Sequence, residues 1–277
     1  MLRNTFLHIP GIGEKSEEKI WDAGAISWDS FKPPFSDNFL KGKNRIISMY
    51  LEESEKHLSG NNPNYFSDLL PSSHHWRMFP EFRNNIAYID IETTGLEEYD
   101  KITTIALYDG GKIYWYVNGR NLEDFARDIF RYKLIVTFNG KTFDAPFIER
   151  FFDIKLNHSH IDLRYVLNSL GYSGGLKACE KKLGISRGDL SGIDGMFAIR
   201  LWNEYIRNDN ERALDTLIAY NIEDVVNLEK LMIISYNKQI LNTFFNTSIH
   251  IDPPSNVEMP FSPDKEIVEK IMQMYFY

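Results

Sequence analysis

The sequence predicts an α/β fold in which helices flank a mixed β-sheet and a small helical module precedes it. Short apolar runs typical of strands alternate with turns and helices between residues 86 and 152, whereas beyond residue 162 the apolar residues recur at helical spacing. Three strand-like runs that precede a strand–helix alternation are typical of a mixed sheet. The pattern contains neither an internal repeat nor a low-complexity run.

The expected elements follow in chain order. Apolar runs predict strands at residues 86–91, 102–107, 112–117 and 134–138. The turn Asp109-Gly110-Gly111 joins the second and third runs as a hairpin. Helical spacing predicts helices at residues 122–131, 145–152 and 211–237.

We expect four parts along the chain. Residues 1–32 form a two-helix pattern around the turn Ile9-Pro10-Gly11-Ile12-Gly13. Residues 33–85 are a proline-interrupted connector that packs on the main domain and contains a short helix near residues 46–58. Residues 86–240 form the main domain, and residues 241–277 a C-terminal extension.

Composition narrows the class of protein. The 277 residues are 43% hydrophobic and 25% charged, which is globular usage, and no apolar run is long enough for a membrane span. The amino terminus has no secretory apolar run and Cys179 is the single cysteine, so we expect a cytoplasmic protein. The net charge of −8 argues against binding nucleic acid by bulk charge, but bound divalent cations would offset part of it.

The first chemical motif is Asp90-Ile91-Glu92, at the end of a predicted strand. Residues two apart on a strand share a face, so both carboxylates can converge on one cation. The turn Thr93-Thr94-Gly95 follows directly and leaves backbone N–H groups near a bound phosphate. Acid pairs of this spacing are common in a chain with 39 acidic residues, so an ordinary turn at the end of a strand is the alternative.

The second motif is the loop from Phe138 to Phe147. Asn139 and Lys141 lie in it close to Asp144, a combination that suits a phosphodiester beside a metal ion. Asp144 also stands where a helix N-cap is expected, with Pro146 in the first turn. A capping role for Asp144 is therefore the alternative.

The third motif is Tyr220-Asn221-Ile222-Glu223-Asp224. Tyr220 and Asp224 are four residues apart, so they lie one above the other on a helix. Both border the apolar stripe of that helix, where a carboxylate can line a cleft. Simple packing is the alternative for Tyr220.

Taken in order, these three motifs resemble those of the DEDDy 3'-5' exonucleases of the ribonuclease H-like (DnaQ-like) superfamily. The resemblance extends to the YprB-like branch through four further segments: Ile161-Asp162-Leu163-Arg164, Gly174-Gly175-Leu176-Lys177 with Glu180, Leu183-Gly184-Ile185 and Leu201-Trp202-x-x-Tyr205. It covers residues 76–232 and implies a mixed five-stranded sheet flanked by helices.

The resemblance also implies roles for individual residues. Asp90, Glu92 and Asp224 would bind one divalent ion directly, Asp90 would bridge to a second, and Asp144 would reach metal through water. Oxygen ligands of this kind suit Mg²⁺ or Mn²⁺. Tyr220 would orient the attacking water. The substrate contacts would be made by Thr94, Gly95, Leu96, Asn139 and Lys141.

A second resemblance lies at residues 7–23, which are similar to a helix-hairpin-helix motif. In such a motif the glycine turn, here Gly11 to Gly13, lets backbone N–H groups bind a phosphate. Glu14, Glu17 and Glu18 are unfavourable beside a polyanion, and packing alone is the alternative for this turn.

The sequence thus predicts a metal-dependent 3'-5' exonuclease that uses two Mg²⁺ or Mn²⁺ ions on a single-stranded 3' end or a duplex end, with no membrane partner. The alternatives are a structure-selective endonuclease with the same acids and a catalytically inactive nucleic-acid-binding module. His158 and His160 lack the spacing of a helical zinc pair, so we do not expect them to bind metal.

Overall fold

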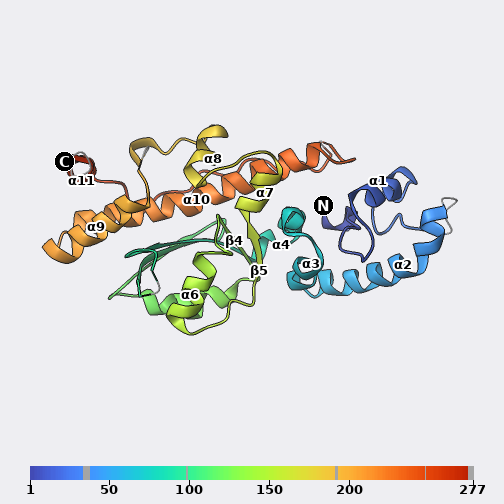
Figure 1. Ribbon diagram of the computed structural model, residues 1–277, viewed down its shortest axis with the longest axis horizontal. Helices are drawn as coiled ribbons and strands as arrows, with labels where there is room; N and C mark the ends of the chain where they lie inside the picture. The colour runs from blue at the N-terminus through green and yellow to red at the C-terminus, as the bar shows by residue number, and fades with distance from the viewer. Residues whose placement is uncertain (34–37, 98, 191–192, 247, 274–277) are drawn as a thin grey trace.

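The structure is a computed structural model that describes residues 1–33, 38–97, 99–190, 193–246 and 248–273. Parts of the predicted connector, main domain and C-terminal extension therefore lie outside the described residues. The molecule is elongated, with α1, α2 and α3 at one end and the sheet with its covering helices beyond α4 (Figure 1).

The sheet has five strands in the order β3-β2-β1-β4-β5. β1 lies at its centre, antiparallel to β2 and parallel to β4. β3 is antiparallel to β2, and β5 is parallel to β4. The predicted mixed five-stranded sheet is thus confirmed. The strands are β1 (Ile86–Thr93), β2 (Ile102–Tyr108), β3 (Ile113–Val117), β4 (Leu134–Thr137) and β5 (Ser159–Asp162).

The hairpin between β2 and β3 forms at the predicted turn. The Asp109 carboxylate accepts hydrogen bonds from the backbone N–H groups of Gly111 at 2.9 Å and Lys112 at 2.7 Å. Gly110 has a φ of 88°, a conformation that a residue without Cβ adopts at no steric cost. These bonds, with one from the Asp109 N–H to the Lys112 carbonyl at 3.2 Å, stabilise the chain reversal.

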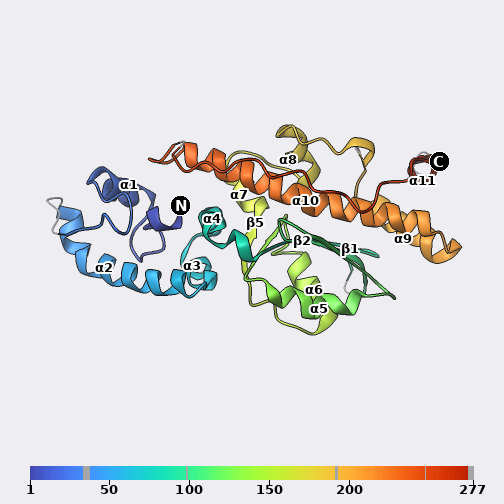
Figure 2. The same cartoon turned by 180° about the vertical axis from the view of Figure 1, so that it is seen from behind.

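Helices cover both faces of the sheet. The long α10 lies across one face with α7, α8 and α9 beside it, and α5 and α6 cover the other (Figures 1 and 2). The α-helices are α1 (Glu14–Asp22), α2 (Asn38–Ser59), α3 (Pro63–Leu69), α4 (Phe79–Phe82), α5 (Phe125–Asp128), α6 (Asp144–Phe152), α7 (Leu163–Ser169), α8 (Leu176–Lys182), α9 (Gly195–Asn208), α10 (Glu211–Leu241) and α11 (Lys265–Gln273).

The two faces of β1 belong to different apolar clusters. Ala87, Ile89 and Ile91 pack with the side chains of α5 and α6, whereas Ile86 and Tyr88 pack with those of α10. Because side chains alternate along a strand, Asp90 and Glu92 continue the face that α10 covers. The alternation of β1 therefore fixes which helices the two acids meet.

Several predicted elements differ from the observed ones. The short helix expected near residues 46–58 is the 22-residue α2, which begins at Asn38. The single helix expected at residues 122–131 is divided into η4 (Leu122–Asp124), α5 and η5 (Ile129–Arg131). The apolar pattern did not predict β5, because its residues Ser159 and His160 are polar.

The prediction of two helices in residues 1–32 is wrong for the first of them. That segment begins with the three-residue 3-10 helix η1 (Leu2–Asn4), and α1 is the α-helix that follows the glycine turn. The buried side chains of Leu2, Phe6, Ile20 and Trp21 nevertheless belong to the same apolar cluster as α10. The N-terminal part is thus packed against the rest of the molecule through a shared core.

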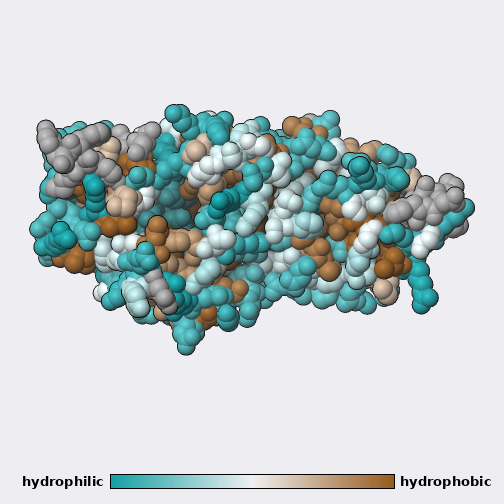
Figure 3. Space-filling view, viewed as in Figure 1, coloured by the Kyte–Doolittle hydropathy of each residue, from teal (hydrophilic) through white to brown (hydrophobic). Residues whose placement is uncertain are grey.

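Hydrophilic residues predominate on the face shown in Figure 3, where the hydrophobic residues form separate patches. Among the described residues, no helix has the length and apolar character needed to cross a membrane.

Candidate active site

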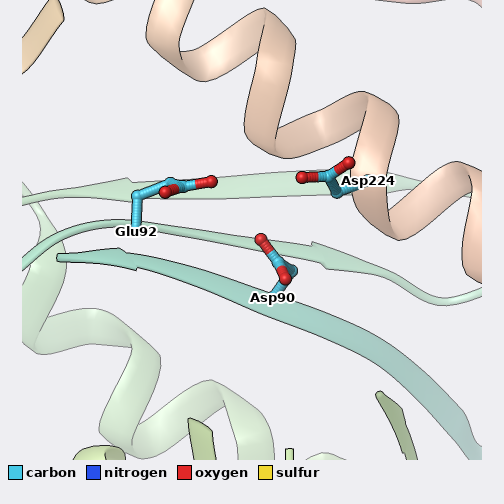
Figure 4. Close-up of side chains that lie close together, drawn as sticks. All are labelled: Asp90, Glu92 and Asp224. Carbon is cyan, nitrogen blue, oxygen red and sulfur yellow. The ribbon is translucent and has the colours of Figure 1, made fainter. Parts of the chain in front are cut away.

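Three of the four predicted acids converge. One carboxylate oxygen each from Asp90, Glu92 and Asp224 lies within 4.8 Å of the others. Figure 4 shows the Asp90 and Glu92 side chains rising from β1 and the Asp224 carboxylate projecting from α10 beside them. A set of carboxylate oxygens this close is suited to a hard divalent cation such as Mg²⁺ or Mn²⁺.

The protonation of the cluster reflects its crowding. Burial, followed by the negative charge of Asp224, raises the pKa of Asp90 well above its ordinary value. The same two causes raise the pKa of Glu92. Both residues keep some contact with solvent, but densely packed protein surrounds their carboxylates. A bound divalent cation would offset the repulsion between these carboxylates. Protons compete with the cation for the same oxygens, so metal binding requires the carboxylates to be ionised.

Asn221 supports Asp90, a role that the sequence analysis missed. Its amide Nδ2 donates hydrogen bonds to Asp90 Oδ2 at 2.8 Å and to the Asp90 carbonyl at 3.2 Å. Its own Oδ1 accepts a hydrogen bond from the Thr104 hydroxyl at 3.1 Å. Asn221 precedes Asp224 by three residues on α10, and this spacing was the only signal available in the sequence.

Asp144 lies outside the cluster of three acids. The structure corrects its predicted position at the N-cap, because Phe143 is the N-cap and Asp144 is the first residue of α6. Its Oδ1 accepts a hydrogen bond from the backbone N–H of Ile91, between the two β1 acids, at 3.3 Å. Burial raises the pKa of Asp144 to about 7. The residue is therefore tied to the strand that carries the cluster.

Tyr220 is buried and has a cationic neighbour. The Lys177 ammonium donates a hydrogen bond to the Tyr220 hydroxyl and lies 4.3 Å from the centre of its ring. Burial raises the pKa of Tyr220 above its ordinary value, so the hydroxyl keeps its proton. Lys177 thus joins Tyr220 to the acids, whose charges also act on its ammonium.

The Asp100 carboxylate packs against the turn after β1. The Thr94 hydroxyl donates a hydrogen bond to Asp100 at 2.7 Å, and a side chain at Gly95 would collide with the same carboxylate. Leu96 is 80% exposed next to this turn. These three residues begin two positions after Glu92, so the predicted substrate loop continues from the end of β1 that carries the acids.

Asn139 and Lys141 occupy a different environment from the one predicted. Their backbone N–H groups donate to the Asp162 carboxylate at 2.8 and 3.1 Å, and Arg164 donates a hydrogen bond to the Asn139 side chain. The Lys141 ammonium lies 3.4 Å from His75 Nδ1. The structure therefore does not place either side chain against Asp144.

The remaining candidates lie elsewhere. Gly11 and Gly13 precede α1, in the N-terminal part of the molecule, and the Lys43 ammonium donates to the Gly11 carbonyl at 2.7 Å. His160 Nε2 lies 2.7 Å from the Thr137 hydroxyl, and His158 Nε2 lies 3.1 Å from the Ile129 carbonyl. Both histidines are thus engaged in structural hydrogen bonds.

A mixed sheet of this strand order, with acids converging from its central strand and from a covering helix, indicates a nuclease. The family model of the RNase_H superfamily matches residues 87–236, more than half of the chain. The chain therefore belongs to the ribonuclease H superfamily, whose nucleases use divalent metals and act on nucleic acid.

Comparison with solved structures gives a distant match. The chain is similar to the family B DNA polymerase from the hyperthermophilic archaeon Pyrobaculum calidifontis, with a TM-score of 0.42 and 15% sequence identity. The match covers 58% of this chain and 26% of the polymerase chain. No curated protein matches the sequence.

Proposed function

We propose that the protein is a 3'-5' exonuclease of the DEDDy group, in its YprB-like branch, and that it hydrolyses phosphodiester bonds with two Mg²⁺ or Mn²⁺ ions. The observation that carries this proposal is the convergence of Asp90, Glu92 and Asp224 within 4.8 Å. The tyrosine four residues before Asp224 supports the assignment to the tyrosine-containing group.

The residues present fit divalent cations. Asp90, Glu92 and Asp224 would hold one ion, Asp90 would share the second, and Asp144 would act through water, as the resemblance implies. The ions, when bound, would stabilise the oxygens that enter and leave at phosphorus. Asn221 engages one oxygen of Asp90, so it would keep that carboxylate oriented for its shared role.

The substrate strand would enter between the β1 turn and a cavity at the end of β4. The cavity has a volume of about 580 Å³, and Phe138, Asn139, Arg164 and Tyr172 are among the residues that line it. Two aromatic rings and a guanidinium at one cavity suit an unpaired nucleobase and its phosphate. This arrangement favours a single-stranded 3' end over a continuous duplex.

A single assay would test this function against its rivals. The full-length protein is incubated with 5'-labelled and 3'-labelled strands in Mn²⁺ or in EDTA. An exonuclease would shorten the strand progressively from its 3' end, whereas an endonuclease would cut at internal sites. Absence of any metal-dependent product would leave only the inactive binding module.

Tyr220→Phe should lower single-turnover hydrolysis by roughly 10-fold to 1000-fold, because a positioned hydroxyl acts on the chemical step. Mn²⁺ affinity, measured by calorimetry, should stay at the wild-type value, since the hydroxyl is not a proposed ligand. The ring should keep its packing because only the oxygen is removed. An unchanged single-turnover rate would assign Tyr220 to packing alone.

We also propose that the chain divides into the four parts expected from its sequence and that the Gly11–Gly13 turn contacts phosphate. Gly11 and Gly13 are exposed, and Gly13 is the N-cap of α1. Glu17 is buried in an ion pair with Arg77, so its charge is withdrawn from this surface.

Gly13→Asp should weaken binding of long nucleic acid several-fold, because a carboxylate at the N-cap repels phosphate. The fold should persist, since Gly13 has an extended backbone, space for a Cβ and a position that favours aspartate. Gly13→Asn is the control, as it caps α1 equally well without charge. Equal affinity of the two variants in a filter-binding series would remove the turn from the nucleic-acid surface.

A further inference from the structure

A buried network of charged and polar side chains contacts Asp224. Arg187 Nη2 forms an ion pair with Asp224 Oδ1 at 2.5 Å. Arg187 Nη1 donates to both carboxylate oxygens of Glu180 at 2.9 Å. Asn227 Nδ2 donates to Glu180 Oε1, also at 2.9 Å. One guanidinium therefore bridges two carboxylates.

The network joins three segments of the chain. Glu180 lies on α8, Arg187 follows α8, and Asp224 and Asn227 are three residues apart on α10. Glu180 and Asn227 are fully buried, and Arg187 is 7% exposed. Because the guanidinium fork is rigid and held from both sides, it fixes the direction in which Asp224 points.

The network also contacts the proposed catalytic tyrosine. The Arg187 guanidinium carbon lies 5.5 Å from the centre of the Tyr220 ring, within the range of a cation–π interaction. Lys177, on α8 as well, bonds the Tyr220 hydroxyl. Both α10 residues of the third motif thus depend on α8 and the segment after it.

The charges of Arg187 and Glu180 cancel, which leaves the negative charge of Asp224. Arg187 next to Asp224 would by itself oppose a divalent cation at that carboxylate, since like charges in a medium of low dielectric repel strongly. The bidentate Glu180 supplies the compensating negative charge. The Arg187–Glu180 pair therefore adds an ion-pair contact to Asp224 without changing the net charge of the site.

We propose that Arg187 is a positioning residue for Asp224 and that Glu180 is the counter-ion that keeps this positioning compatible with metal binding. This inference rests on the proposed metal-dependent hydrolysis. Arg187 occupies one oxygen of Asp224 and leaves the second for a cation, while Glu180 and Asn227 prevent the guanidinium from turning away.

Opposite effects of two substitutions on metal affinity test the proposal. Mn²⁺ binding to the full-length protein is measured by calorimetry at pH 8, without nucleic acid. Glu180→Gln leaves Arg187 uncompensated, so affinity should fall about tenfold. Arg187→Gln removes the repelling charge, so affinity should equal or exceed that of the wild type, while turnover falls at least tenfold because Asp224 is no longer fixed.

The double variant Glu180→Gln with Arg187→Gln gives the sharpest outcome. It restores charge balance, so Mn²⁺ affinity should recover to within about threefold of the wild type while turnover stays low. If the network only stabilised the fold, Mn²⁺ affinity should fall in both single variants and fall further in the double variant. That result would overturn the proposal.

Two further arms keep the test decisive. Arg187→Lys keeps the charge but cannot bridge two carboxylates, so it should retain Mn²⁺ affinity and lose turnover; full turnover in this variant would overturn the positioning role. The Arg187→Lys variant also tests the positioning role if Arg187→Gln does not fold. Failure of the wild type itself to bind Mn²⁺ would refute the proposed function, an outcome distinct from failure of this inference.

Discussion

Asp90→Asn should abolish hydrolysis, leaving less than a few per cent of wild-type turnover, while the fold stays intact. Asp90 lies closest to the centre of the proposed mechanism, since it would contact both ions. Asparagine has the same shape and keeps one oxygen, but it lacks the charge that a divalent cation requires. End-labelled substrate in Mn²⁺, with circular dichroism as the check on folding, measures both parts of the prediction.

The same substitution should raise the melting temperature of the metal-free protein. Burial and neighbouring acids raise the pKa of Asp90, so the folded state loses stability as pH rises through that pKa and the carboxylate ionises. The gain from Asp90→Asn should therefore be larger at pH 8 than at pH 5. Added Mn²⁺ should stabilise the wild type and not the variant.

Glu123→Gln is a matched control, because Glu123 is an exposed acid in η4 and outside the cluster. It should leave turnover, melting temperature and the response to Mn²⁺ unchanged. Substantial turnover in Asp90→Asn would refute the assignment of Asp90 as a metal ligand.

The acidic cluster was predictable because it depends on local periodicity. The two-residue repeat of β1 places Asp90 and Glu92 on one face, and the helical repeat of α10 places Asp224 beside its apolar stripe. Both regularities can be read from neighbouring residues. The sequence could thus indicate which carboxylates face the interface of sheet and helix, although not the distances between them.

The parts that escaped prediction depend on contacts between distant residues. β5 contains the polar residues Ser159 and His160. The Ser159 hydroxyl donates a hydrogen bond to Asn64 Oδ1 at 2.7 Å, and Asn64 lies 95 residues earlier in the chain. Arg187 lies after the short helix α8, and no helical or strand spacing relates it to Asp224. Only the folded chain shows that the two residues form an ion pair. Lys141 shows that proximity in sequence does not ensure contact. It lies three residues before Asp144, but its ammonium lies 3.4 Å from His75 Nδ1.

Glu17→Gln should destabilise the protein by about 3–5 kcal/mol, because it leaves the buried Arg77 charge without a counter-ion. Arg77 Nη1 lies 2.8 and 2.9 Å from the two Glu17 oxygens. Glu17 Oε1 also accepts hydrogen bonds from the backbone N–H groups of Phe6 at 2.6 Å and Leu7 at 3.2 Å. This carboxylate therefore joins the first residues of the chain, α1 and η2 (Ser72–Met78).

The size of the effect follows from burial. Glu17 is 1% exposed and Arg77 is 3% exposed, so water cannot solvate the guanidinium when its partner is lost. In contrast, the Arg3–Glu55 ion pair has side chains that are 43% and 45% exposed. Glu55→Gln should accordingly cost no more than about 1 kcal/mol. Urea denaturation of both variants measures the difference.

A second substitution separates the lost ion pair from the lost packing. Arg77→Met in the Glu17→Gln background removes the stranded charge and fills the space beside Trp21 and Trp76, whose ring centres lie 6.0 and 5.3 Å from the guanidinium carbon. Because replacing a buried ion pair by apolar atoms is often neutral, the double variant should regain at least half of the lost stability. If Glu17→Gln and Glu55→Gln cost the same, the N-terminal part is held by its apolar core and not by this ion pair.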